Sequence, residues 1–289
     1  MTAIVDAHFH CWRLDRGDYG WLTPALAPIH RDIAIADWQR ESRPCGVQAG
    51  ILVQAAPTEA ETRFLLDQAR GHDAVLGVVG WIDLLAADAP RRIAALAAAE
   101  PKLRGLRPML QDIADPDWIG QPRLAPALDA MAAHGLVFDA LVKPLHLPRL
   151  VALSRRHPAL RIVIDHGAKP DIAAGQWQPW ASGVQALAGQ PNIVCKLSGL
   201  LTEAGARPAR GVARAWCEHL LHCFGPQRVL WGSDWPVLEL AATYRDWWGD
   251  TQAVLAPLSP EDRRAVLGGN ACRVYGVALR PAPPAATRS

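Results

Sequence analysis

The amino-acid sequence predicts an α/β fold, a distorted (β/α)8 TIM barrel formed by a single domain. Eight short apolar runs rich in β-branched residues recur along the 289 residues, and each is followed by a segment of helical character. Such alternation is typical of a parallel sheet, and eight strand–helix units close into a barrel of about 250 residues. The alternative is an open doubly wound sheet, but the first strand is not followed by the Gly-x-Gly-x-x-Gly pattern of dinucleotide binding.

The elements can be placed in order from these patterns. Strands are expected at residues 3–10, 50–54, 75–81, 103–110, 136–142, 161–166, 193–198 and 228–234. Helices are expected at residues 33–42, 58–71, 88–100, 121–134 and 147–157, in a stretch ending near 188, at 208–223, and beyond 234 to about 275. Thr58-x-x-Glu61 has the pattern of a capping box. We expect the barrel domain to span residues 1–279 and the Pro/Ala-rich tail at 280–289 to be disordered.

Composition and charge narrow the classes of function. Half of the residues are hydrophobic, and the formal net charge is +2 with both signs interspersed. This balance gives no reason to expect nucleic acid or a membrane surface as a partner, and no apolar run approaches the roughly 18 residues of a membrane span. The first residues lack the basic-then-apolar pattern of a signal peptide, so we expect a cytoplasmic protein. The six cysteines form no C-x-x-C pair and are expected to be reduced thiols.

The first strand ends in a His-x-His pair. Side chains alternate between the two faces of a strand, so Asp6, His8 and His10 are expected on one face and the apolar residues between them on the other. Polar residues at the C-terminal strand ends of a (β/α)8 barrel build its active site. The loop that follows, residues 11–30, is long enough to fold over such a site.

Polar residues collect at the other strand ends as well. Three of the four lysines of the chain lie at or just beyond such an end. Imidazoles, cations and carboxylates on one rim indicate an active site rather than a solvated face. The residues at the strand ends are His8, His10, Gln54, Trp81, Arg107, Asp139, Lys143, Asp165, His166, Lys196, Ser198 and Asp234.

Six sequence blocks in order carry a family resemblance over residues 3–277. They are Val-Asp-Ala-His-Phe-His-Cys-Trp (5–12), Gly-Asp-Tyr-Gly-Trp-Leu (17–22), Leu-Arg-Gly-Leu-Arg-Pro-Met-Leu-Gln (103–111), Ile-Asp-His-Gly-Ala-Lys-Pro (164–170), Val-Cys-Lys-Leu-Ser-Gly-Leu (194–200) and Trp-Gly-Ser-Asp-Trp-Pro-Val (231–237). The chain resembles the amidohydrolase superfamily, and within it the branch that opens sugar lactones such as L-fucono- and L-rhamnono-lactone. More distantly it resembles 2-pyrone-4,6-dicarboxylate lactonases. The resemblance implies a hydrolase of carbohydrate metabolism with Asp234 as general base.

The acidic and imidazole candidates each have a functional and a structural interpretation. We expect Asp234 to be catalytic, although an aspartate there could instead cap a helix. His8 and His10 are expected to orient water and the carboxylate, and the alternative is a pair of hydrogen-bonded core histidines. His166 follows two isoleucines on one strand face and is expected to act on a carbonyl or to bind a metal.

The remaining candidates are expected to stabilise charge or hold the substrate. Lys196 lies in an apolar strand and needs a counter-charge, which a substrate or Asp234 could supply. Arg107 fits a bidentate clamp for substrate oxygens, with a structural ion pair as the alternative. Further substrate contacts are expected from Gln54, Trp81 and Asp139.

Metal dependence is left open by the resemblance. Many amidohydrolases bind one or two divalent ions, but the fifth predicted strand offers no histidine. We favour a reaction that needs no cofactor, in which Lys196, Arg107 and His166 stabilise charge instead. The alternative is one divalent metal, zinc or manganese, with the ligands His8, His10, His166 and Asp234.

The expected reaction is hydrolysis of a sugar-acid lactone, a small molecule. Asp234 takes a proton from water, the water attacks the lactone carbonyl, and the proton then passes to the departing ring oxygen. The alternatives are a metal-dependent amidohydrolase or esterase, a decarboxylase of the same superfamily, and a non-catalytic protein that binds sugar acids. The sequence fixes neither the particular lactone nor the oligomeric state.

Overall fold

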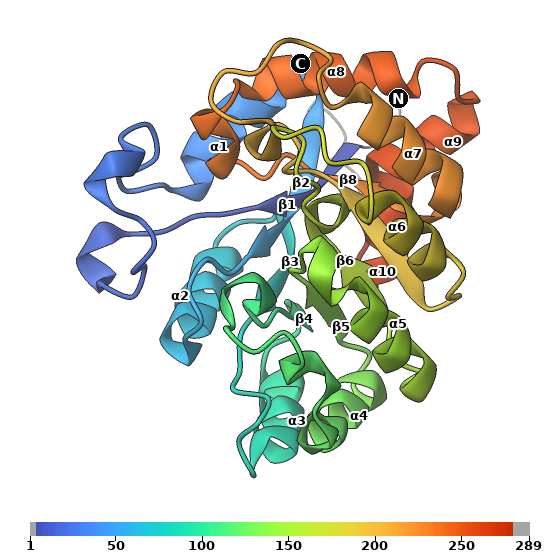
Figure 1. The fold of residues 1–289 in the computed structure, drawn as a ribbon. Helices are drawn as coiled ribbons and strands as arrows, with labels where there is room; N and C mark the ends of the chain where they lie inside the picture. Colours follow the sequence, from blue (N-terminus) through green and yellow to red (C-terminus); the bar gives the residue numbers. More distant parts are fainter. Residues whose placement is uncertain (1–3, 280–289) are drawn as a thin grey trace, which may run out of the picture.

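Eight parallel strands follow one another around the centre of the molecule in the computed structural model, which describes residues 4–279 (Figure 1). Each strand pairs with the next, and the chain after β8 returns to β1 through a bridge between Phe9 and Trp235. The predicted (β/α)8 barrel is confirmed. The strands are β1 (Ile4–Phe9), β2 (Val47–Val53), β3 (Val75–Gly80), β4 (Leu103–Leu106), β5 (Val137–Ala140), β6 (Ile162–Ile164), β7 (Ile193–Leu197) and β8 (Val229–Trp231).

Helices surround the strands, and each predicted helical segment contains at least one of them (Figure 1). The tail predicted to be disordered, residues 280–289, lies outside the described residues. Between residues 4 and 279, no helix is both long and apolar enough to cross a membrane. The helices are α1 (Ile35–Ser42), α2 (Glu59–Arg70), α3 (Ala89–Ala99), α4 (Ala125–Ala133), α5 (Leu147–Arg156), α6 (Trp180–Ala188), α7 (Arg214–Phe224), α8 (Tyr244–Leu255), α9 (Pro260–Arg264) and α10 (Asn270–Tyr275).

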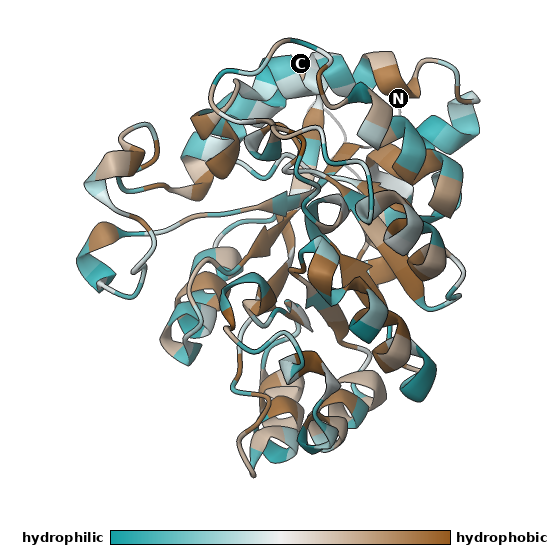
Figure 2. Ribbon diagram, viewed as in Figure 1, coloured by the Kyte–Doolittle hydropathy of each residue, from teal (hydrophilic) through white to brown (hydrophobic). Residues whose placement is uncertain are grey.

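Apolar side chains pack on both faces of the strands. Hydrophobic residues are frequent along the strands at the centre of the molecule (Figure 2). Inside the barrel, Val53, Val137 and Leu230 are fully buried among the side chains of neighbouring strands. Val274 of α10 packs against this interior cluster, and Asn270 Nδ2 donates to the Val229 carbonyl at 2.7 Å, so α10 closes the N-terminal end of the barrel. Each fully buried aliphatic side chain contributes roughly 1.5–3 kcal/mol of hydrophobic stabilisation.

The first strand does not alternate as expected. The pairing of β1 with β2 shifts register between Asp6 and Phe9, and the Asp6 carboxylate accepts a hydrogen bond from the His8 backbone N–H at 3.1 Å. Consecutive residues of a regular strand point to opposite faces. Because of this irregularity, His8 and its neighbour Ala7 both point into the barrel. The prediction that Asp6 shares a face with the two histidines is therefore wrong.

Asp6 instead faces the surrounding helices and ties the first strand to the end of the chain. Its carboxylate accepts from Trp38 Nε1 at 3.0 Å, Tyr244 Oη at 2.9 Å and Ser233 Oγ at 2.6 Å. Burial raises the pKa of Asp6, and the hydrogen bonds from Ser233, Trp38 and His8 counteract part of that rise. The carboxylate thus fastens β1 to α1, α8 and the turn after β8.

All eight strands end sooner than predicted, by one to four residues. The strands β4, β6 and β8 stop at Leu106, Ile164 and Trp231, so the functional candidates that follow them lie in turns. His166 (φ 52°) and Asp234 (φ 59°) adopt the left-handed conformation, which costs a non-glycine residue roughly 1–2 kcal/mol. The sequence predicted that His166 would lie on the same strand face as the two isoleucines before it. In the structure it does not, because it lies in the turn after the strand. The turn re-aims its side chain.

The segment between β1 and α1, here called the β1–α1 excursion (residues 10–34), projects from the barrel beyond the end of β1 (Figure 1). Tyr19 Oη donates to the buried Glu61 carboxylate at 2.5 Å, and Trp21 Nε1 donates to the Ala55 carbonyl at 2.7 Å. Thr58 Oγ1 caps α2 by accepting from the Glu61 backbone N–H at 3.0 Å, as predicted. The Glu61 carboxylate accepts the hydrogen bond from Tyr19 of the β1–α1 excursion and does not complete the capping box.

Replacing Glu61 by Gln should remove a pH dependence of stability. Burial, opposed by Tyr19 and Ala55, raises the pKa of Glu61 from 4.5 to about 7. A carboxyl with a raised folded-state pKa stabilises the protein below its unfolded pKa, and this contribution is lost as pH rises through about 7. Between pH 5 and pH 8 we expect the free energy of unfolding of the wild type to fall, relative to the variant, by up to about 3 kcal/mol.

Urea denaturation at several pH values measures this difference. Glu41→Gln, at an exposed position on α1, is the control and should follow the wild type. Parallel pH profiles for the wild type and Glu61→Gln would contradict the assignment.

Candidate active site

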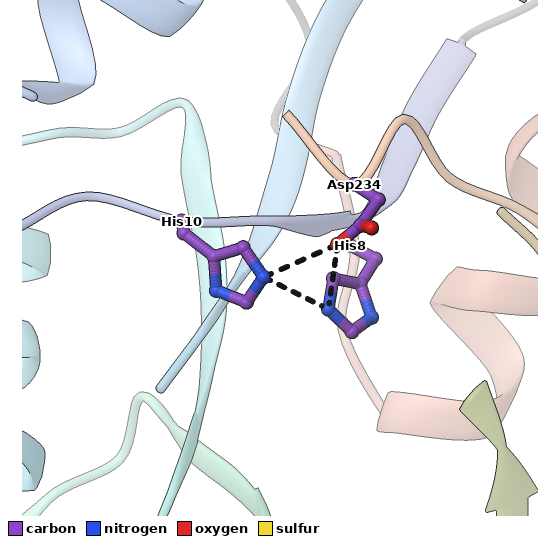
Figure 3. A group of neighbouring side chains, drawn as sticks. All are labelled: His8, His10 and Asp234. Atoms are coloured by element: carbon purple, nitrogen blue, oxygen red, sulfur yellow. Dashed lines mark hydrogen bonds and ion pairs between the residues drawn. The ribbon is translucent and has the colours of Figure 1, made fainter. Parts of the chain in front are cut away.

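One carboxylate oxygen is the meeting point of three imidazoles. His10 Nε2 lies 3.3 Å, His8 Nε2 3.6 Å and His166 Nε2 3.7 Å from Asp234 Oδ1. His8 and His10 approach each other to 3.2 Å between their Nε2 atoms (Figure 3). All four side chains are buried, and all four were predicted as site residues.

Backbone pairing between β1 and the turn after β8 sets this arrangement. The Asp234 N–H donates to the His8 carbonyl at 2.8 Å, and the His10 N–H donates to the Trp235 carbonyl at 2.8 Å. The Asp234 carbonyl accepts from the Leu238 N–H at 2.9 Å, while its carboxylate turns to the histidines. The side chain therefore does not act as a helix cap, which was the structural alternative.

His10 presents a bare nitrogen to the carboxylate when it is neutral. Its Nδ1 lies 2.7 Å from the Val53 carbonyl, which can only accept, so Nδ1 carries the proton. The unprotonated Nε2 then faces Asp234 Oδ1, which is also an acceptor. Two acceptors 3.3 Å apart repel each other unless a second proton or a cation lies between them.

His8 has two possible proton arrangements. Its Nδ1 lies 3.1 Å from Lys196 Nζ, a donor, and 3.4 Å from Asp165 Oδ1, an acceptor. If Lys196 donates to Nδ1, the ring proton is on Nε2 and can bridge to His10. If Nδ1 donates to Asp165, then Nε2 is bare, as a metal ligand must be.

The electrostatics favour a neutral His8 and a neutral His166 beside an ionised Asp234. Burial lowers the pKa of His8 well below its ordinary range, with Lys196 as the next cause, and lowers the pKa of His166 to about 4. Burial alone would raise the pKa of Asp234, but His166, His10 and His8 outweigh it and bring this pKa below its ordinary value. Asp234 is therefore ionised at neutral pH.

The donor set fits a single divalent ion. Four ligands at bonds of about 2.0 Å around a tetrahedral ion lie about 3.3 Å apart. The distance between the His8 and His10 Nε2 atoms is 3.2 Å, and the distances from Asp234 Oδ1 to the three Nε2 atoms are 3.3, 3.6 and 3.7 Å, close to that ligand–ligand distance. Neutral imidazoles and one carboxylate are typical zinc ligands, and a cation would resolve the repulsion between His10 and Asp234. His8, His10 and Asp234 are thus able to hold a metal, and His166 lies beside them with its Nε2 3.7 Å from Asp234 Oδ1.

A layer of buried charges lies next to His8. Lys196 Nζ pairs with Asp139 Oδ2 at 2.6 Å and Asp165 Oδ1 at 2.9 Å, and all three side chains are fully buried. Arg107 Nη1 lies 3.3 Å from Asp165 Oδ2, and Tyr275 Oη of α10 donates to Asp139 at 2.8 Å. The counter-charges of Lys196 are therefore Asp139 and Asp165. The prediction of Asp234 or a substrate as its partner is wrong.

Two of these partners, Asp165 and Tyr275, were given no role from the sequence. Asp165 was noted at a strand end but given no role, although it directly precedes His166 in the same sequence block. Tyr275 reaches the site from the far end of the barrel, and the sequence does not show that it contacts Asp139. Burial opposes ionisation of Asp165, but Lys196 and His8 bring its pKa well below its usual range.

A cavity of about 250 Å³ opens beside the cluster. The predicted site residues His10, Arg107, His166 and Asp234 line it. Sequence reasoning missed the other polar and aromatic lining residues, since each lies in a loop whose path the sequence does not reveal. They are Trp21 from the β1–α1 excursion, Gln111 and Asp112 after β4, and Lys169 after β6.

Three predicted substrate contacts, Gln54, Trp81 and Asp139, do not line this cavity, and Asp139 belongs to the buried layer around Lys196. Gln54 Nε2 donates to the Arg107 carbonyl at 2.8 Å, and Arg107 Nη2 donates back to the Gln54 carbonyl. Trp81 lines a separate cavity, and its carbonyl accepts from Thr62 at 2.8 Å. Gln54 therefore supports Arg107, and neither side chain lines the cavity beside Asp234.

The chain belongs to the amidohydrolase family, whose model matches residues 5–277. L-Fucono-1,5-lactonase of Burkholderia ambifaria is 48% identical over 282 residues, 96% of this chain and 97% of that protein. L-Fucono-1,5-lactonase of Burkholderia multivorans is 35% identical, covering 94% of this chain and 96% of that one. A crystal structure of a Burkholderia multivorans amidohydrolase with bound zinc has a TM-score of 0.90 at 35% identity and covers 96% of this chain and all of that one. The family resemblance read from the sequence blocks is confirmed.

Replacing Gly199 by Ala should weaken metal binding by displacing His166. A Cβ at Gly199 (φ +63°) would lie 2.5 Å from His166 Nδ1, too close for the ring to stay in place. We expect the affinity for Zn²⁺, measured by calorimetry, to fall roughly ten- to a hundred-fold, as when the support of a ligating histidine is lost.

Gly175 is the matched control because it has the same φ of +63° and nothing within 4 Å of an added Cβ. Gly175→Ala should therefore cost stability without changing Zn²⁺ affinity. Equal affinities in the wild type and Gly199→Ala would refute the role given to this glycine.

Proposed function

We propose that this protein hydrolyses a 1,5-lactone of a sugar acid, such as L-fucono-1,5-lactone. The observation that carries the proposal is an ionised, buried Asp234 among three imidazoles beside a cavity of about 250 Å³. That volume lies just below the roughly 300–1,000 Å³ usual for ligand pockets and suits a substrate with one ring. Two relatives that cover nearly the whole chain are L-fucono-1,5-lactonases, which supports a sugar lactone over other cyclic esters.

In the proposed reaction, Asp234 accepts a proton from the attacking water. A new C–O bond forms at the lactone carbonyl, and the bond to the ring oxygen breaks. Arg107 and His166 line the same cavity and stabilise the negative charge on the carbonyl oxygen. The low pKa of Asp234 makes it a weak base, so it passes the proton on to the departing ring oxygen.

Lys196 acts in this proposal through its neighbours. It does not line the cavity, but it holds Asp165 at 2.9 Å and His8 Nδ1 at 3.1 Å. Together with Arg107, its charge balances the two buried carboxylates beside it. We propose that Lys196 and Asp139 position His8, and that Gln54 positions Arg107.

We also propose that the site takes one divalent ion, zinc or manganese, held by His8, His10, His166 and Asp234. When bound, such an ion polarises a carbonyl and lowers the pKa of a bound water. The support is the mutual spacing of the His8, His10 and Asp234 donor atoms, the 3.7 Å between His166 Nε2 and Asp234 Oδ1, and the bare Nε2 that His10 turns to Asp234. The metal-free alternative favoured from the sequence places a proton between those two groups instead.

The cellular setting follows from the substrate. A sugar-acid lactone belongs to carbohydrate metabolism and reaches the cavity as a free small molecule. The six cysteines are free, as expected in a reducing compartment, which supports a cytoplasmic location.

A pH-indicator assay on a panel of sugar 1,4- and 1,5-lactones tests the proposed function. We expect hydrolysis of L-fucono-1,5-lactone, loss of that activity with a chelator, and recovery on adding zinc or manganese. Activity that survives complete metal removal would show that the proposed metal is not needed, and it would leave the proposed lactonase function in place. If no lactone in the panel is hydrolysed, the proposed function is wrong, and carbon dioxide release would then identify a decarboxylase.

A further inference from the structure

An indole ring of the β1–α1 excursion forms part of the cavity wall and is open to solvent. Trp21 lines the cavity together with His10 and Asp234, and 36% of its surface is exposed. Sites for small organic ligands are lined mainly by apolar and aromatic side chains, with a few polar groups that fix the orientation of the ligand. The exposed surface of Trp21 is therefore available to a ligand beside the catalytic cluster.

The end of β2 holds this ring next to His10. Trp21 Nε1 donates to the Ala55 carbonyl at 2.7 Å, and His10 Nδ1 donates to the Val53 carbonyl at 2.7 Å. The two carbonyls are two residues apart in the chain, and two residues span at most about 7 Å. One short stretch of backbone thus fixes both the indole and an imidazole of the catalytic cluster.

Trp12 supports the indole of Trp21 from within the excursion. The two rings are nearly perpendicular, with an interplanar angle of 87° and centroids 5.6 Å apart, and Trp12 is fully buried. The Trp12 ring also lies 6.3 Å from the His10 ring, and its Nε1 donates to the Arg31 carbonyl at 2.8 Å. A ring held by a hydrogen bond and an aromatic contact has little freedom left to lose when a ligand packs against it.

The ring of a sugar lactone matches such a surface. Its C–H groups form apolar patches between the hydroxyls, and contact with an aromatic side chain removes these patches from water. Trp21 is the one Trp, Tyr or Phe residue among the described residues that line the cavity, and Trp81 lines a separate cavity. We propose that Trp21 binds the substrate by packing its indole against the C–H groups of the lactone ring, which rests on the proposed lactonase function.

This contact contributes to binding and not to the chemical step. The attacked carbonyl carbon changes its charge and geometry in the transition state, whereas the C–H groups elsewhere on the ring keep theirs. An interaction that is equally strong in the bound substrate and in the transition state lowers KM and leaves kcat unchanged. Trp21 therefore differs from Asp234, whose loss lowers kcat.

The test separates the flat ring of Trp21 from its hydrogen bond, which by itself only anchors the excursion to Ala55. Trp21→Phe and Trp21→Leu both remove the Nε1 donor, but only Phe keeps a flat aromatic ring. Trp177→Leu is the matched control. Trp177 is also 36% exposed and packs against Trp180 with centroids 5.3 Å apart at 70°, but it does not line the cavity.

Steady-state hydrolysis of L-fucono-1,5-lactone gives kcat and KM for each enzyme. We expect Trp21→Leu to raise KM roughly ten-fold, because part of the apolar ring surface then stays in contact with water. Its kcat should stay within about three-fold of the wild type, which also shows that the variant is folded. Trp21→Phe should keep both constants within about three-fold, and Trp177→Leu should change neither.

Equal KM values for the Phe and Leu variants would overturn the role of the indole surface. So would a ten-fold rise of KM in Trp21→Phe, which would show that the hydrogen bond to Ala55 is what matters; this outcome can be read even if Trp21→Leu does not fold. Either result leaves the lactonase function in place. A wild type that hydrolyses no lactone overturns the proposed function and this inference together.

Discussion

The site depends on a carboxylate that stays ionised in the protein interior. Burial by itself raises the pKa of Asp234, and His166, His10 and His8 bring it below its ordinary value. They reach it only because the chain after β8 pairs with β1, through the hydrogen bonds from Asp234 N to His8 and from His10 N to Trp235. The backbone pairing that closes the barrel is therefore also the pairing that assembles the site.

The charges beneath this cluster form a balanced set. Lys196 and Arg107 face Asp139 and Asp165, two cations and two carboxylates in the barrel interior. Removing one member of a buried pair leaves an uncompensated charge, which typically costs 3–5 kcal/mol. These buried charges thus hold His8 in place by electrostatic interactions. Tyr275 of α10 contributes by donating a hydrogen bond to Asp139. A helix at the opposite end of the barrel thereby supports the active site.

The sequence alone predicted the barrel, its eight strands and the convergence of His8, His10, His166 and Asp234, because hydrophobic periodicity and strand-end position are local properties. The failures came from long-range contacts. The irregularity in β1 depends on donors to Asp6 from helices far along the chain, and the partners of Lys196 lie on other strands. Left-handed turns at non-glycine residues have no sequence signature.

The central claim is that Asp234 accepts the proton of the attacking water. The most direct measurement is the turnover of L-fucono-1,5-lactone by Asp234→Asn, prepared with the same metal content as the wild type and checked for an unchanged unfolding transition. The account predicts that kcat falls by about 10²–10⁴, the usual contribution of a general base. A folded, metal-matched variant that keeps kcat within about ten-fold of the wild type would contradict it.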